Sequence, residues 1–271
     1  MDTSLSQRCL DIRCDCLKAI GHLGVGHIGG SLSVVELLTV LYFEAMNIDP
    51  SRPKMPGRDR FICSKGHAGP AVYAALANRG YFPKELLLTL NQGGTSLPSH
   101  CDMNRTPGID MTTGSLGQGF SCAVGAALGS KLEGDGAMIY TLIGDGESQE
   151  GQVWEAAMFA GHKKLDNLVV IVDNNGLQID GPITEVCDSN PIDKKFEAFN
   201  FHVITIDAHN FDEIRAAFAE ARKTKGMPTA IIAKSIKGKG VSFMENNYAW
   251  HGSAPNEEQY NQAMEDLKEV A

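Results

Sequence analysis

No apolar run in the sequence reaches the roughly 18 residues that a membrane-spanning helix needs. The N-terminal segment, MDTSLSQRCLDIRCDC, also lacks the charged and then apolar pattern of a secretory signal peptide. We therefore expect a cytoplasmic protein that does not associate with a membrane.

The sequence also has no excess of basic residues. It contains 24 Lys and Arg against 33 Asp and Glu, which gives a formal net charge of −9. Because nucleic-acid phosphates are bound mainly by Lys and Arg, this balance argues against a nucleic-acid partner. The basic residues cluster only in KSIKGKG, residues 234–240. This cluster could contact an anion or lie on a solvated face, and the solvated face is the commoner outcome.

Two kinds of motif are missing. The seven cysteines include no pair of CxxC elements, so a reduced protein without structural zinc is the simplest interpretation. No GxGxxG follows the first expected strand, which argues against a nicotinamide-binding Rossmann protein.

Apolar strand candidates alternate along the chain with helical patterns. A helix is expected over residues 5–22, and Ser33 is expected to cap a second helix through its hydroxyl. The strand candidates are apolar throughout, which indicates a parallel sheet covered on both faces. We therefore predict an α/β fold, with three α/β/α layers and a mostly parallel, doubly wound sheet, in a single domain over residues 1–271. The main strand candidates are RFICS, AMIYTLI, NLVVIVDNN, FHVITID and PTAIIAKSI.

Polar residues follow two successive strand candidates. The first ends in Gly144, Asp145 and Gly146, and the second in DNNG, residues 173–176. About one βαβ crossover separates them, and ligands of such sheets bind beyond the carboxyl ends of the strands, so we expect Asp145 and Asn175 to converge. A carboxylate and an amide oxygen suit Mg²⁺ shared with a diphosphate. The glycines let the backbone approach phosphate without a Cβ in the way, although GDG alone would indicate only a tight turn.

The segment GDGESQEGQVWEAAMFAGHKKLDNLVVIVDNNGLQIDG resembles the thiamine diphosphate motif in its transketolase form. The resemblance extends over nearly the whole chain, but it matches only the N-terminal, diphosphate-binding half of a full-length transketolase. It implies the thiamine diphosphate-binding fold and the N-terminal subunit of a split transketolase. Such an enzyme transfers a two-carbon glycolaldehyde unit from a ketose phosphate to an aldose, with thiamine diphosphate and Mg²⁺, or Ca²⁺ or Mn²⁺ in its place. The other matching segments, in order, are GHIGGSLSVVELLTVLYFEAM, RDRFICSKGHAGPAVYAAL, TPGIDMTTGSLGQGFSCAVGAAL, KSIKGKGVSFMEN and WHG.

The resemblance implies a set of cofactor contacts. Asp145 and Asn175 match the side-chain metal ligands, and Leu177 matches the residue that ligates through its backbone carbonyl. Gly146, with Gly144 beside it, matches the contact to the diphosphate.

Three further positions match the family. Gly114 and Leu116, in TTGSLGQG, match backbone contacts to the ring portion of the cofactor, although this loop could simply cap the next helix. They end a long irregular stretch, residues 91–116, and such loops inside compact domains are often functional. Glu150 matches an acidic residue at the subunit interface, although a carboxylate in the first turn of a helix is also favoured by the helix dipole.

Four of the eight histidines match active-site positions of the family. His67 and His251 match residues beside the diphosphate and the reacting substrate, and His27 and His100 match residues that bind substrate hydroxyls and assist proton transfer. Imidazole suits these tasks because it titrates near neutral pH. Serine and cysteine flank His100 in place of the usual glycine and proline, which leaves the loop shape and the sugar preference open. The remaining histidines are expected to be structural: His22, His162, His202 and His209.

The matched half of a transketolase lacks the glutamate that contacts the aminopyrimidine ring of the cofactor, because that residue belongs to the following domain. We therefore expect the chain to be inactive alone and to pair with a separate C-terminal subunit, as a heterotetramer with two copies of each, acting on sugar phosphates. The donor could be a pentulose phosphate, a sulfonated sugar or a branched sugar phosphate.

Three other interpretations remain open. A 1-deoxyxylulose-5-phosphate synthase and a 2-oxo acid dehydrogenase α chain share the GDG and NN elements, but fit ESQEGQVWEA and TTGSLGQG less well. A non-catalytic subunit that only holds the cofactor would not need the four loop histidines.

Overall fold

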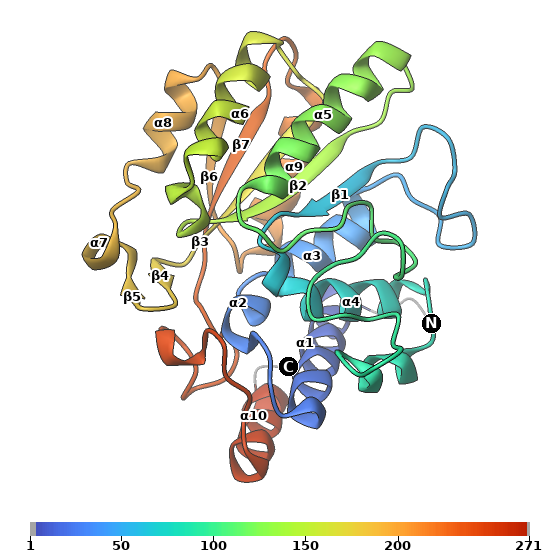
Figure 1. Cartoon of the computed structure of the whole chain (residues 1–271), viewed down its shortest axis with the longest axis vertical. Helices are drawn as coiled ribbons and strands as arrows, with labels where there is room; N and C mark the ends of the chain where they lie inside the picture. Colours follow the sequence, from blue (N-terminus) through green and yellow to red (C-terminus); the bar gives the residue numbers. More distant parts are fainter. Residues whose placement is uncertain (1–3, 270–271) are drawn as a thin grey trace.

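A five-stranded sheet forms the centre of the computed structural model, which describes residues 4–269 (Figure 1). The strand order is β1-β2-β3-β7-β6, and every neighbouring pair is parallel. This confirms the predicted α/β fold with a mostly parallel sheet. The strands are β1 (Arg60–Cys63), β2 (Ile139–Gly144), β3 (Leu168–Asn174), β6 (His202–Asp207) and β7 (Thr229–Lys234), and a small separate ladder pairs β4 (Leu177–Gln178) with β5 (Gly181–Pro182).

Side-chain alternation along the strands places apolar residues on both faces of the sheet. In β3, Leu168, Val170 and Val172 pack into one apolar cluster, whereas Val169 and Ile171 pack into the other. Successive side chains of a strand point to opposite faces, so a strand that is apolar throughout must be covered on both. This is why the strand candidates lack the alternation of a half-exposed strand.

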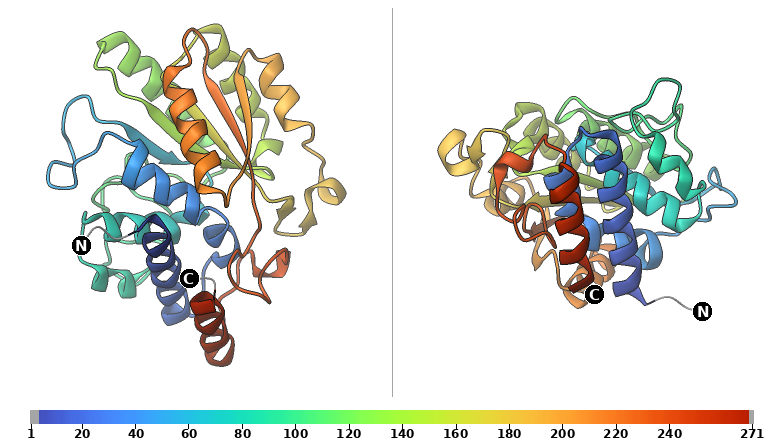
Figure 2. Two further views of the ribbon diagram at one scale, coloured as in Figure 1. Left: turned by 180° about the vertical axis from the view of Figure 1, so that it is seen from behind. Right: turned by 90° about the horizontal axis from the view of Figure 1, so that it is seen from below.

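Helices supply both covers. The cluster on one face contains residues of α5 (Gln118–Glu133), α6 (Gly151–His162) and α8 (Ile192–Ala198). On the opposite face α9 (Phe211–Lys223) lies over the sheet, as the view from behind shows (Figure 2). The same cluster continues into helices below the sheet: α1 (Leu5–Leu23), α2 (Ile28–Leu32), α3 (Val35–Val40), α4 (Gly69–Arg79) and α10 (Glu257–Glu269).

Short elements complete the chain between these helices and strands. They are the π-helix Leu41–Ala45, the 3₁₀ helices Gly66–Ala68, Lys84–Thr89, Glu147–Gln149 and Tyr248–Trp250, and the single turn α7 (Ile183–Val186). No helix among residues 4–269 combines the length and the apolar character that crossing a bilayer requires.

Ser33 does not cap the second long helical segment, contrary to the expectation. The helix α3 starts from Val34, and the Ser33 hydroxyl instead donates to the Asp173 carboxylate at 2.7 Å. A buried carboxylate accepts a stronger hydrogen bond than a neutral backbone amide offers, so the tertiary contact replaces the local cap. The expected helix over residues 5–22 is present as α1.

Gly161 allows the closest contact between α6 and the segment that follows α8. A Cβ at this position would lie 1.8 Å from the backbone oxygen of Phe199. We expect Gly161→Ala to lower the free energy of unfolding by about 3 kcal/mol, since neither backbone can move away without repacking the core. Gly125→Ala on the exposed face of α5 is the matched control, because a Cβ there meets nothing within 4 Å. Gly125→Ala should raise the free energy of unfolding by about 0.5–1 kcal/mol. Denaturant unfolding of both variants measures the difference. Equal stabilities of the two variants would contradict the close contact.

Candidate functional site

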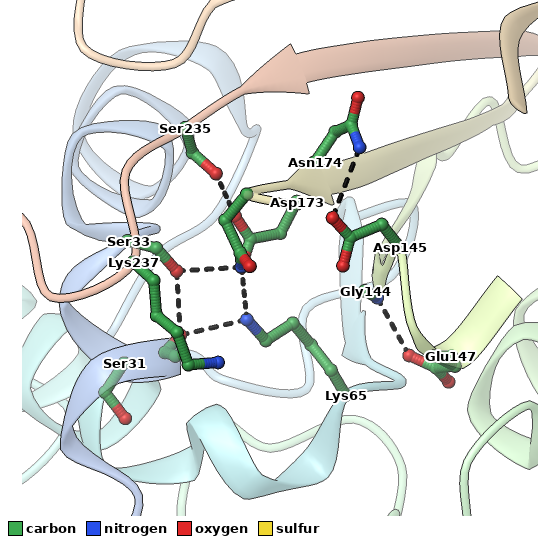
Figure 3. A network of polar contacts seen from close by, with 12 residues as sticks. Ser31, Ser33, Lys65, Gly144, Asp145, Glu147, Asp173, Asn174, Ser235 and Lys237 are labelled. Atoms are coloured by element: carbon green, nitrogen blue, oxygen red, sulfur yellow. Dashed lines mark hydrogen bonds and ion pairs between the residues drawn. The ribbon is translucent and has the colours of Figure 1, made fainter. Parts of the chain in front are cut away.

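Asp145 joins the ends of the two neighbouring strands β2 and β3. Its side chain is 1% exposed, and Oδ1 accepts a hydrogen bond from Gly146 N at 2.8 Å. Its Oδ2 accepts from Gly176 N at 2.5 Å. The same oxygen accepts from Asn174 Nδ2 at 3.2 Å (Figure 3). The GDG turn and the DNNG turn are therefore bonded to each other through this one carboxylate, as the register Gly144 opposite Asp173 allows.

The two turns open into a cavity of about 380 Å³ at the carboxyl ends of the strands. Its wall contains every position that the sequence suggested for catalysis, cofactor or metal: His27, His67, His100, Gly114, Leu116, Gly144, Asp145, Gly146, Glu150, Asn175, Leu177 and His251. It also contains residues to which the sequence assigned no role, namely Lys65, Glu147, Gln149, Gln178, Ile179 and Lys237.

The four histidines reach the cavity from four separate segments. His27 precedes α2, His67 lies in the 3₁₀ turn after β1, and His251 follows the turn Tyr248–Trp250. His100 comes from the long loop. The Tyr73 hydroxyl contacts the backbone of this loop and lies 2.9 Å from the Pro98 carbonyl oxygen and 3.0 Å from the His100 carbonyl oxygen.

The rings form one group around His27. Its ring centroid lies 5.3 Å from that of His67, 5.8 Å from that of His100 and 5.6 Å from that of His251. The rings of His67 and His251 are 4.9 Å apart.

These imidazoles are neutral at neutral pH. Burial lowers the pKa of each, and for His100 burial is the one cause. For His251 the pKa falls to about 3, because burial is reinforced by the positive charge of Lys237 and by His27 and Lys65. A neutral imidazole carries one donor and one acceptor nitrogen, so the group can both give and take protons from hydroxyls.

Lys237 shows that the basic cluster KSIKGKG does not lie entirely on a solvated face. Its side chain is 1% exposed, and Nζ lies 3.1 Å from Nδ1 of His251. Burial, together with the charge of Lys65, lowers the pKa of Lys237 to about 8. Lys234 is exposed, so the segment divides between solvent and site. Nothing in the spacing of the lysines distinguishes the buried one.

Glu147 is the second residue of the site that the sequence left without a role. It is 3% exposed, and its carboxylate accepts hydrogen bonds from the Ser64 hydroxyl, from Gly117 N at 2.8 Å and from Gly144 N at 3.0 Å. It thereby ties the GDG turn to the segment after β1 and to the start of α5. Burial raises the pKa of Glu147, and these three donors partly offset that effect.

The close approach of the loop around Gly114 explains the glycine in SKGH. A Cβ on Gly66 would lie 2.8 Å from Gly114 N and 2.9 Å from the Thr113 carbonyl carbon. A side chain there would push the loop that carries Gly114 and Leu116 away from the cavity.

Two of the histidines expected to be structural have partners outside the cavity. His209 Nδ1 lies 3.2 Å from Glu36 Oε2, and its Nε2 accepts from Ile236 N at 2.9 Å. His202 Nε2 lies 2.6 Å from Glu220 Oε1.

Comparison with known proteins identifies the family to which this arrangement belongs. Residues 6–268 match the family described as transketolase, thiamine diphosphate binding domain. The chain belongs to the transketolase family. This confirms the family inferred from the GDG and DNNG segments.

Individual relatives agree with the assignment. A 6-deoxy-6-sulfo-D-fructose transketolase subunit from Clostridium sp. (strain MSTE9) is 56% identical over 95% of this chain and 94% of that protein. An apulose-4-phosphate transketolase subunit from Actinobacillus succinogenes is 41% identical over 90% of this chain and 88% of that protein. These relatives are themselves subunits, so the prediction of the N-terminal, thiamine diphosphate-binding subunit of a transketolase is confirmed and the rival enzyme classes are not favoured.

The transketolase from Leishmania mexicana superposes with a TM-score of 0.92 at 32% identity, over 98% of this chain but only 41% of that one. The chain therefore spans less than half the length of this transketolase. The match covers nearly all of this chain, which agrees with the expected correspondence to one half of such an enzyme.

The residues of the cavity fit a diphosphate shared with a divalent cation. Among residues 4–269, no three His, Cys, Asp or Glu side chains converge as a self-sufficient metal site. A cation here would have the Asp145 carboxylate, the Asn175 amide and the Leu177 carbonyl, and it would need oxygens from an anion to complete an octahedron. The buried ammonium groups of Lys65 and Lys237 suit such an anion.

Acid should destabilise the fold through His251. The unfolded imidazole takes up a proton near its ordinary pKa of 6.5, whereas the folded one does so only near about 3. The unfolded state therefore binds more protons between these values, and the free energy of unfolding should fall as the pH drops from 7 toward 4. His251→Asn should flatten this fall, measured by denaturant unfolding at each pH. Identical pH dependences of the two proteins would contradict a neutral, half-buried His251.

Proposed function

We propose that the chain forms, together with a C-terminal partner subunit, a transketolase that uses thiamine diphosphate and Mg²⁺. The observation that carries this proposal is the single cavity in which Asp145, Asn175 and Leu177 share a wall with four neutral imidazoles. A metal–diphosphate site alone would need only the first set, and the histidines are what ketose chemistry adds.

The residues that would hold the cofactor follow from the wall of the cavity. Asp145, the Asn175 amide and the Leu177 carbonyl would ligate Mg²⁺. Gly146, which follows Asp145 and precedes the 3₁₀ helix Glu147–Gln149, would contact the diphosphate. The backbone at Gly114 and Leu116 would contact the ring portion of the cofactor. Bound thiamine diphosphate would supply the nucleophilic carbon needed to cleave a ketose.

The protein's own groups would handle the protons. His27 and His100, whose rings lie 5.8 Å apart, would bind and deprotonate substrate hydroxyls. His67 and His251 would stand beside the diphosphate and the reacting carbons. Glu150 is exposed immediately before α6, where it is available to the second protein.

We propose a sulfonated ketose as the donor. The support is the 56% identity to a 6-deoxy-6-sulfo-D-fructose transketolase subunit, compared with 41% to an apulose-4-phosphate transketolase subunit. A sulfonate is a monoanionic tetrahedral group, so its recognition differs from that of a phosphate in charge rather than in shape.

The purified chain should show no transketolase turnover alone and should gain it when co-purified with its C-terminal partner. The physical reason is that the cavity wall, as residues 4–269 build it, contains no unengaged buried acid to activate the cofactor. The measurement is aldose formation from a ketose donor with thiamine diphosphate and Mg²⁺ present. Turnover by the lone chain would refute the two-subunit arrangement.

The assembled enzyme should use 6-deoxy-6-sulfo-D-fructose with a kcat/KM at least about tenfold above that for apulose 4-phosphate, which corresponds to about 1.4 kcal/mol of selective transition-state binding. The two donors are compared in the same preparation with the same acceptor. A preference for the branched phosphate, or equal use of both, would exclude the sulfonated donor as the preferred substrate.

A further inference from the structure

Asp173 is a fully buried carboxylate next to the proposed metal ligands, and it is not itself one of them. It lies near the end of β3 and is 0% exposed. Its Oδ2 accepts from Lys65 Nζ at 2.5 Å, from Ser33 Oγ at 2.7 Å and from Asn175 Nδ2 at 3.0 Å. Its Oδ1 accepts from the Ser235 hydroxyl (Figure 3).

Every described hydrogen-bond partner of this carboxylate is a donor. The Lys65 ammonium forms an ion pair with Oδ2, and the hydroxyls of Ser33 and Ser235 donate to the two oxygens. Lys65 is itself 2% exposed and donates its other hydrogen bond to Gly30 O at 2.9 Å. The pair is therefore a fixed, charged anchor beneath the cavity.

This anchor decides which end of the Asn175 amide faces the cavity. A carboxylate can only accept, so Asp173 holds the NH₂ end of Asn175 and rejects its oxygen. The carbonyl end then points away from Asp173, where Oδ1 accepts from Leu177 N at 3.0 Å and keeps a second lone pair. Only the oxygen end of an amide can ligate a cation.

The neighbouring amide provides a contrast. Asn174 turns its NH₂ end toward Asp145 at 3.2 Å, and its oxygen accepts from Lys234 Nζ instead. The two adjacent asparagines therefore donate to different carboxylates, Asn174 to Asp145 and Asn175 to Asp173. Of the two residues, only Asn175 has its donor end held by Asp173.

We propose that Asp173 is a positioning residue that fixes the amide of Asn175 with its oxygen toward the divalent cation. The proposal rests on the proposed function of the site. Asp173 does not touch the cation or the substrate. It acts through Asn175, in the way that hydrogen-bonded neighbours orient metal ligands in other proteins.

The test uses the full chain assembled with its partner, and measures the Mg²⁺ concentration that gives half-maximal binding of thiamine diphosphate. Asp173→Asn combined with Lys65→Met removes the acceptor-only group while keeping the buried cluster neutral, so the protein should fold. Because Lys65 also lines the cavity, the effect is measured relative to Lys65→Met alone. The Mg²⁺ requirement should rise about 10–100-fold, the usual effect of losing a partner of a metal ligand. If charge alone mattered, this charge-balanced variant would match the wild type and overturn the proposal.

The second variant exchanges the two side chains, as Asp173→Asn with Asn175→Asp. The amide introduced at position 173 can donate to the carboxylate introduced at position 175, whose free oxygen then faces the cation. We expect this variant to regain most of the wild-type Mg²⁺ dependence, whereas Asn175→Asp alone, with two carboxylates in contact, should not. Additive losses in the exchanged pair would overturn the proposal.

Ser235→Ala is the matched control. It removes a hydrogen bond from the same buried carboxylate but leaves the contact with Asn175 intact. It should lower thermal stability while leaving the Mg²⁺ requirement unchanged, and a rise equal to that of the charge-balanced variant would show a merely structural role. A wild-type enzyme that binds thiamine diphosphate without any divalent cation would instead refute the proposed function itself.

Discussion

The buried ion pair between Lys65 and Asp173 is the interaction on which the carboxyl end of the sheet depends. It joins the segment after β1 to the end of β3, and the two serine hydroxyls on Asp173 add the α2–α3 junction and the end of β7. Removing one partner of a buried pair typically costs about 3–5 kcal/mol, because the other charge is left uncompensated. The strand ends that carry the cavity are thus held together by charge as well as by the apolar layers.

The same lysines also set the protonation of the histidines. Lys65 and Lys237 stand among the imidazole rings, and their positive charges add to burial in keeping His27, His67 and His251 neutral. A diphosphate bound beside them would need that positive charge. Under the proposed function the two lysines would bind the anion and the imidazoles would exchange protons, which accounts for both residue types lining one cavity.

The sequence was sufficient to predict the sheet, because strands that are apolar on both faces leave a strong pattern. It was also sufficient to predict that Asp145 and Asn175 lie at one cavity, because GDG and DNNG follow successive strands. It was not sufficient for residues whose role depends on distant partners. The local sequence around Ser33 predicts a helix cap, but in the fold its hydroxyl donates to Asp173, which lies far along the chain. In the sequence, nothing distinguishes Lys237 from the neighbouring lysines. In the fold it is buried and its Nζ contacts His251. Local spacing contains no information about either contact.

The carboxylates of the cavity give a physical reason for a second subunit. Asp145 is the proposed ligand of the cation, and Glu147 accepts three hydrogen bonds that join the GDG turn to its neighbours, so neither is left to activate a cofactor. Glu150 is exposed at the start of α6, on the wall rather than deep in the cavity. No further acid lines the cavity among residues 4–269, so under the proposed function the acid at the far end of the cofactor would come from the partner subunit. Apolar side chains at the same wall, Leu116 at 37% and Ile179 at 59% exposure, are placed where such a partner would cover them.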